Sequence, residues 1–178
     1  MKKDHRLYNM ILPPFMLWGF VPWMTTVAIV GNFIIDSVVL LILSAVFFKK
    51  ADWRFYINCI FKIWIFGFLA DVIGWLFLFI IAFTSHASYV GDDSLAHQIE
   101  SGVYFAVNHG NSFYNIWSFL YLFCGVLIAG ILIFVLDYFI SFNRTSLTKK
   151  QRIKAALSFA VFTAPYTFLL PSPSEWFF

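Results

Sequence analysis

This sequence is poor in charge and in cysteine. Only 12% of its 178 residues are charged, against about 25% in an ordinary soluble domain. Its two cysteines are too few for a disulfide framework. Its basic residues lie in short clusters beside apolar stretches and form no stripe with polar neighbours, which argues against nucleic acid as a partner. These shortages indicate that the chain is not an ordinary soluble domain.

Apolar residues are abundant instead, with 61% hydrophobic and 22% aromatic residues. A membrane-crossing helix needs about 20 mostly apolar residues. We therefore expect an all-α integral membrane protein, with residues 1–178 forming a single transmembrane domain. It should be a compact bundle of about five transmembrane helices and one external amphipathic helix. The expected spans are about 8–26, 28–48, 60–83, 116–140 and 155–170, and residues 84–115 form the external loop.

The division of the first two spans rests on one turn. Residues 8–48 would make about 60 Å of helix, enough to cross a bilayer twice. Two positions suit the turn, near Thr25-Thr26 or later at Gly31-Asn32. The sequence leaves this choice open.

The distribution of charge predicts an orientation. All twelve Lys and Arg residues fall in clusters at 2–6, 49–62 and 144–154, and cytoplasmic loops collect such residues. The opposite side carries Asp92, Asp93, Glu100 and Glu175. We expect a cytoplasmic N-terminus and an external C-terminus in a plasma membrane, with a bacterial inner membrane favoured by the short loops. Membrane lipid is the expected partner, including anionic headgroups at the basic clusters.

Two acidic residues inside the apolar spans are the strongest candidates for a functional site. Such a group costs roughly 2.5–3.5 kcal/mol to insert and usually faces the protein interior. Asp71 lies near the middle of the third expected span, and Asp36 shares an arc of the second with Asn32. We predict that Asp36, Asp71 and Asn32 form a proton or cation site, because two nearby carboxylates in a low dielectric cannot both ionise cheaply. The alternative is that hydrogen bonds of these residues only hold the helices together.

Asp137 has a different expected role. It precedes Arg144 by seven residues, roughly 10 Å along a helix. We expect it to be solvated or paired with a snorkelling Lys or Arg, and to be structural. In the fifth span, Ala156, Ala160 and Ala164 predict a packing stripe, and Pro165 predicts a kink.

The external loop should contain an amphipathic helix over Asp93–Val107, with an apolar stripe of Leu95, Ile99, Val103 and Ala106. On its polar face, Asp93, His97 and Glu100 follow helical spacing and can face one metal ion such as Zn. Two further histidines, His86 and His109, can complete the ligand shell. The alternative is a solvated polar face on an interfacial helix. No other cofactor is expected.

Three functions are compatible with these features. The first is a small transporter or channel for protons or cations that uses the midplane Asp residues. The second is a non-catalytic membrane subunit, an assembly, immunity or lipid-interacting factor, which would bind a membrane protein partner or a second copy of the chain. The third is an intramembrane or metal-dependent enzyme. The third is disfavoured because no specific motif is visible and because Cys59 and the loop histidines are expected on opposite sides.

Overall fold

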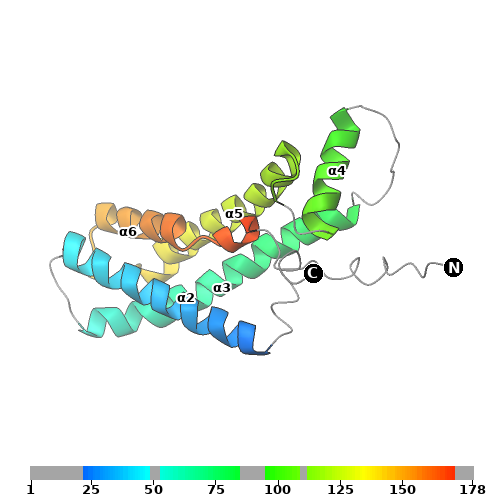
Figure 1. Ribbon diagram of the computed structural model, residues 1–178. Helices are drawn as coiled ribbons and strands as arrows, with labels where there is room; N and C mark the ends of the chain where they lie inside the picture. The colour runs from blue at the N-terminus through cyan, green and yellow to red at the C-terminus, as the bar shows by residue number, and fades with distance from the viewer. Residues whose placement is uncertain (1–21, 49–52, 85–94, 109–111, 171–178) are drawn as a thin grey trace. The chain divides into compact units, whose positions relative to one another are not determined.

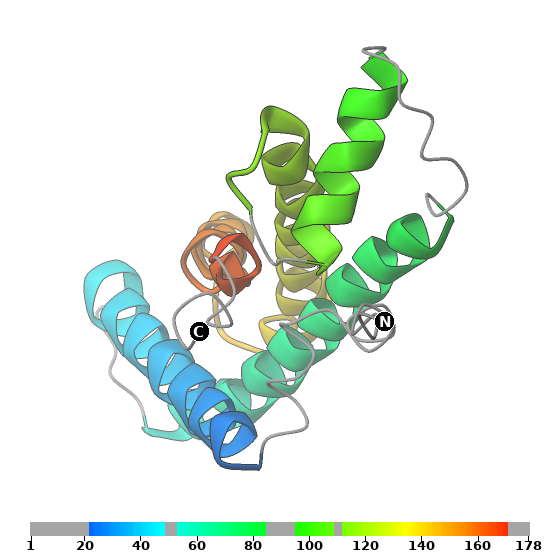
Figure 2. The ribbon, with the colours of Figure 1, turned by 45° about the vertical axis from the view of Figure 1, so that its right-hand side comes forward.

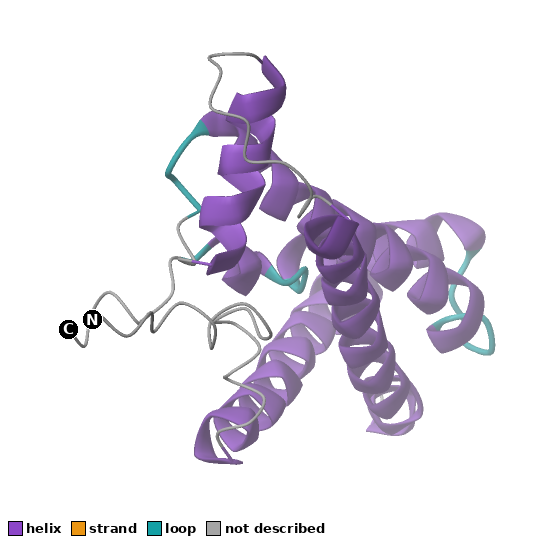
Figure 3. Cartoon of the chain, turned by 90° about the vertical axis from the view of Figure 1, so that its right-hand side faces the viewer, coloured by secondary structure: helices purple, strands orange, loops and turns teal. Residues whose placement is uncertain are grey.

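The computed structural model describes residues 22–48, 53–84, 95–108 and 112–170. Every regular element in these ranges is helical (Figure 1), and Figure 3 shows no strand among them. The elements are α2 (Pro22–Leu43), the π-helix η2 (Ser44–Phe48), α3 (Trp53–Thr84), α4 (Leu95–Asn108), α5 (Ile116–Leu136), the π-helix η3 (Asp137–Ser141), α6 (Lys149–Phe162) and the 3-10 helix η4 (Tyr166–Leu169). The expected all-α class is therefore confirmed for this part of the chain.

Three stretches of the described chain are long and apolar enough to cross a membrane: Ile29–Val46, Trp53–Phe83 and Ile116–Ser141. Within an 18-residue segment of each stretch, only 22%, 17% and 33% of the residues, in that order, are buried inside the protein. The rest of each stretch presents apolar side chains outward, as on α2, where Ile34 and Ile42 are more than half exposed. Such wide apolar faces are suited to lipid.

The first predicted turn is wrong at both proposed positions. The helix α2 continues through Thr25-Thr26 and through Gly31-Asn32. Pro22 is its first residue, a position where the missing backbone N–H removes no helical hydrogen bond. An isolated glycine lowers helix stability by only about 1 kcal/mol, so Gly31 does not end so apolar a helix. Most of the first expected span, residues 8–26, lies outside the described residues.

The fifth predicted span also differs from the observed helix. The helix α6 has 14 residues, or about 21 Å, which is shorter than the roughly 30 Å hydrocarbon core of a bilayer. It begins at Lys149, well before the expected start, because Thr148 and Gln151 form a reciprocal capping box. The helix thus starts and ends earlier than the expected span of 155–170, and a separate 3-10 helix follows it. That this segment crosses the membrane stays a prediction.

Pro165 accounts for the early end of α6. A helix continuing to Pro165 would lack the hydrogen bond to the carbonyl of Val161. The helix ends at Phe162 instead, and the backbone N–H of Thr163 donates to the carbonyl of Phe159 at 2.9 Å in its last turn. The proline thus ends the helix, where a kink was expected.

Contacts between residues divide the chain into two compact units. One, here called the α4 unit, comprises Met1–Thr26, Leu76–Gly125 and Tyr166–Phe178. The other, the α6 unit, comprises Val27–Trp75 and Val126–Pro165. The expectation of a single transmembrane domain stays a prediction.

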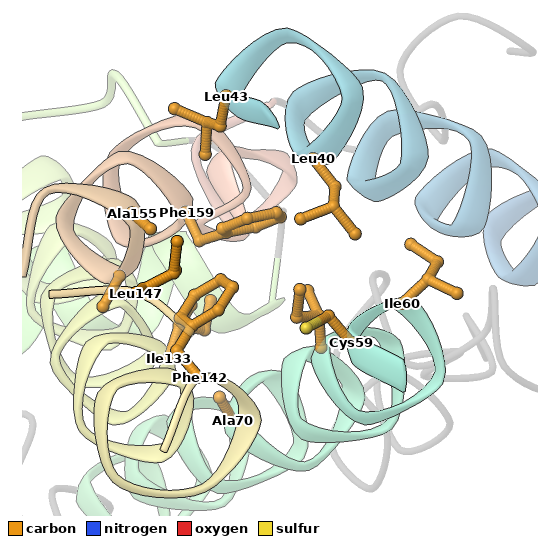
Figure 4. Packing of buried hydrophobic residues seen from close by; sticks show 12 residues of the cluster. Leu40, Leu43, Cys59, Ile60, Ala70, Ile133, Phe142, Leu147, Ala155 and Phe159 are labelled. Atoms are coloured by element: carbon orange, nitrogen blue, oxygen red, sulfur yellow. The ribbon is translucent and has the colours of Figure 1, made fainter. Parts of the chain in front are cut away.

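The α6 unit has an apolar core to which all four of its helices contribute. Figure 4 shows these side chains converging from α2, α3, α5 and α6, and Figure 2 shows α6 beside α2. The buried residues are Leu40, Leu43, Cys59, Ile60, Ile63, Ala70, Ile133, Phe142, Leu147, Ala155, Ala156 and Phe159. The predicted small-residue stripe takes part, since a Cβ on Gly130 would lie 3.4 Å from the carbonyl oxygen of Ala160 and 3.9 Å from the Cβ of Ala164.

Within this unit α2 and α3 run antiparallel. The Tyr56 hydroxyl donates to Ser37 Oγ at 2.8 Å, and Trp64 Nε1 donates to the carbonyl of Ile29 at 3.3 Å. The partner in α2 falls in number as that in α3 rises, which is the pattern of antiparallel neighbours. This register places residues 29–37 of α2 alongside residues 56–64, in the N-terminal half of α3.

In the α4 unit, α4 packs against the start of α5. Ser118 Oγ donates to the carbonyl of Gly102 at 2.8 Å, and Asn115 Nδ2 donates to that of Gln98 at 3.2 Å. The buried core is Leu78, Val103, Ala106, Tyr121 and Leu122. A helix is therefore present where the sequence predicts an amphipathic one. Only the second half of its apolar stripe is buried, because Leu95 and Ile99 are exposed.

Candidate functional site

Asp36 is buried in the α6 unit, on the face of α2 that meets α3. Its side chain is 5% exposed. Its Oδ2 lies 3.9 Å from where a Cβ on Gly67 would stand. Gly67 lies one helical turn before Asp71 on α3, so the two share a face. A Cβ on Gly67 would be in ordinary van der Waals contact with the carboxyl group of Asp36, so Asp36 and Gly67 are neighbours.

Asp71 occupies the centre of this face of small residues. Ala70 and Gly74 beside it are buried, whereas Asp71 itself is partly buried. Its Oδ1 is inaccessible to solvent and has no hydrogen-bond partner among the described residues. The carboxyl groups of Asp36 and Asp71 interact electrostatically. The structure thus places Asp36 against the face of α3 that carries Asp71. That the two acids form a functional pair stays a prediction.

Asn32, the third predicted member, lies one turn before Asp36 and is partly buried. Ser37, on the same arc, is occupied elsewhere. Its hydroxyl donates to the carbonyl of Phe33 at 2.7 Å and accepts from Tyr56. The hydrogen bond between Tyr56 and Ser37 therefore joins α2 to α3 without an Asp side chain. That Asn32 contributes to a site stays a prediction.

Asp137 joins the pair as a third acid, and its expected environment is corrected. It is 1% exposed and neither solvated nor paired with a basic side chain among the described residues. Ser141 Oγ donates to its Oδ1 at 2.8 Å, while its Oδ2 has no partner there. Its carboxyl group interacts electrostatically with that of Asp36. The reason for the correction is that η3 turns this residue into the core of the unit, away from the nearby basic connection.

The three carboxyl groups come from three different helical segments of one unit, and no Lys or Arg of the described chain contributes to the electrostatic interactions of any of them. An ionised carboxylate buried without a counter-charge is strongly unfavourable, so such a group either holds a proton or binds a cation. Among the described residues, no three His, Cys, Asp or Glu side chains are grouped to hold one metal ion. The arrangement therefore suits protons on separate carboxyl groups better than one ion held by all three.

The predicted external metal site rests on residues that the structure describes only in part. His97 and Glu100 lie in α4 and are partly buried. Asp93, His86 and His109 lie outside the described residues. Two of the five candidate ligands cannot define a metal geometry, so a metal at this loop stays a prediction.

The two cysteines carry no chemistry in the described residues. Cys59 is fully buried, and its thiol donates weakly to the carbonyl of Ser141 at 3.8 Å. Cys124 is exposed and free. Cys59 therefore behaves as a small apolar core residue.

Sequence reasoning missed Asp137 as a member of the cluster. The signal available was its spacing of four residues from Ser141, which places a hydroxyl donor on the same helix face. The proximity of Arg144 in the sequence pointed the other way. Comparisons with models of protein families, with characterised proteins and with solved structures find no match to this chain.

Proposed function

We propose that this chain is an integral membrane protein that moves protons across the bilayer through the carboxyl groups of Asp36 and Asp71. One observation carries the proposal. Asp36, which is buried, and Asp71, of which one carboxyl oxygen is inaccessible to solvent, lie on adjacent antiparallel helices and interact electrostatically. No Lys or Arg of the described chain contributes to that interaction. Both residues lie well inside candidate membrane spans, Asp36 within Ile29–Val46 and Asp71 within Trp53–Phe83.

The chemistry follows from this environment. Two neighbouring carboxyl groups in a low dielectric are most stable when they hold fewer than two negative charges between them. A pair that holds one proton consists of one carboxyl group and one carboxylate. A second proton binds the carboxylate, and the first proton is then released from the other group. Acids arranged in this way within membranes act as proton relays. Asn32, one turn away on α2, supplies a neutral polar group on the same side of that helix.

The proposed topology follows the basic clusters. The connection between α2 and α3 and that between α5 and α6 face the cytoplasm, so α2, α3 and α5 each cross the membrane. The predicted cytoplasmic N-terminus requires a further span before α2, in a part of the chain that lies outside the described residues. The helix α6 enters from the cytoplasmic side and ends within the bilayer, because its last turn packs against Gly130 inside the span Ile116–Ser141.

The test is proton flux in liposomes that hold the purified full chain and a pH-sensitive dye, driven by a potassium diffusion potential. Asp71→Asn keeps the size of the side chain and removes its exchangeable proton. We expect it to lower the flux by about 100-fold, the typical contribution of a positioned acid–base group. Asp71→Glu is the matched control, because it retains a carboxyl group, and it should retain most of the flux.

The result is interpretable only if both variants elute as one species and unfold at the temperature of the wild type. Absence of flux in the wild type, or flux unchanged by Asp71→Asn, would overturn the proposal. That result would favour a non-catalytic membrane subunit. Flux of Na⁺ or K⁺ that depends on Asp71 would replace the proton by a cation at the same site.

A further inference from the structure

The third acid of the cluster has a geometry that a purely structural role does not require. Asp137 is the first residue of η3, and π-helical turns within α-helices are frequent at functional sites. One carboxyl oxygen accepts from Ser141 at 2.8 Å, whereas the other is buried without a partner in the described chain. A buried polar atom left unpaired is destabilising. The fold therefore holds one carboxyl oxygen ready for a proton or a water molecule.

The groups around Asp137 favour proton exchange over a fixed ion pair. Asp36 of α2 interacts with it electrostatically. From α3, the Cys59 thiol interacts electrostatically with both Asp137 and Lys62. The α6 residues in the same core, Ala155, Ala156 and Phe159, bear no charge. The carboxyl group of Asp137, which is hydrogen-bonded to Ser141 and interacts with Asp36, can therefore lose and regain a proton.

Asp137 lies near the end of its span that is followed by basic residues. It lies four residues before the end of the span Ile116–Ser141, about 6 Å along the helix axis. Beyond that end come Arg144 and the basic start of α6. Asp36 interacts with both Asp71 and Asp137. The three acids thus form a series in which Asp36 is the middle member and Asp137 the one nearest the basic end of the span.

We infer that Asp137, oriented by Ser141, is a third proton-binding position that links the Asp36–Asp71 pair to the basic side of the membrane. In each step one O–H bond breaks at a protonated carboxyl group and one forms at a carboxylate, directly or through water. The negative charge moves in the opposite direction, so charge balances and no further reactant is needed. This inference rests on the proposed function.

Two substitutions distinguish a proton carrier from a structural acid because they have opposite effects in the two roles. Asp137→Asn keeps an oxygen that accepts from Ser141 and removes the exchangeable proton. Asp137→Glu keeps the proton and displaces that oxygen. A proton carrier predicts about 100-fold lower flux for Asp137→Asn, with most of the flux and a larger solvent deuterium isotope effect for Asp137→Glu. A structural acid predicts the reverse order of flux.

The measurement is the liposome flux assay on the full chain, with unfolding temperature recorded for each variant. Ser141→Ala, which leaves the carboxyl group intact but unoriented, serves if Asp137→Asn does not fold. It should lower the flux by about tenfold without loss of the folded protein. The inference is overturned if the flux of Asp137→Asn is within about twofold of the wild type. If Asp137→Asn does not fold, the same criterion applies to Ser141→Ala.

The two proposals fail in different ways. If the wild type carries no flux that Asp71→Asn removes, the proposed function fails and this inference fails with it. If Asp71→Asn removes the flux while Asp137→Asn leaves it intact, only the inference fails. Loss of flux in both, with retention in the two Glu variants, supports the series of three acids.

Discussion

Replacing Gly102 by alanine tests the packing of α4 on α5. A Cβ at this position would lie 2.6 Å from Asn115 Oδ1, 2.7 Å from Trp117 Cβ and 2.9 Å from the backbone nitrogen of Ser118. The last two atoms cannot swing away, because they are fixed by the backbone of α5. The two helices must therefore separate in Gly102→Ala.

The change in stability of the docked α4 in Gly102→Ala is the sum of opposing contributions. Overpacking of this kind costs about 1–3 kcal/mol, and separation weakens the bonds from Ser118 to Gly102 and from Asn115 to Gln98, about 1 kcal/mol each. Alanine gains about 1 kcal/mol of helix propensity over glycine. Since these contributions are not fully additive, we expect a net loss of about 2 kcal/mol for the docked state of α4.

Hydrogen–deuterium exchange of the protein in detergent micelles measures this loss at α4. A change of about 2 kcal/mol corresponds to about 30-fold faster exchange of its amides. Gly31→Ala is the matched control, because a Cβ on Gly31 would meet nothing within 4 Å, and it should leave α4 unchanged. Exchange at α4 in Gly102→Ala that equals the control, or is slower than in the wild type, would refute the reasoning.

Two further predictions concern single hydrogen bonds. Tyr121→Phe removes the donor to the carbonyl of Leu78, a buried bond of 2.5 Å, and should lower the free energy of unfolding by about 1 kcal/mol; an unchanged thermal midpoint in detergent would contradict it. Thr148→Ala removes the capping box of α6 and should destabilise its first turn by about 1 kcal/mol, seen as faster amide exchange at 149–152. Thr148→Ser keeps the capping oxygen and should behave like the wild type.

The all-helical fold and the stretches apolar enough to cross a membrane could be predicted because their signals are local. Long apolar stretches and the clustering of basic residues depend only on composition along the chain. The positions of α3, α4 and α5 follow from such stretches, and the structure has helices there. The turn in the first 48 residues and the length of α6 could not be read in this way. They depend on which of several permissive residues interrupts a helix, and on the cap at Thr148.

The candidate site divides along the same line. The sequence by itself determined that Asp36 and Asp71 lie in apolar helices, since each is flanked by apolar residues on both sides. It did not determine that Asp36 faces Gly67, or that Asp137 is buried beside them. Which face a helix turns toward its neighbours depends on packing between residues distant in sequence. Only the tertiary structure, through the packing of Asp36 beside Gly67 and the burial of Asp137 in its π-helical turn, brings three acids into one unit.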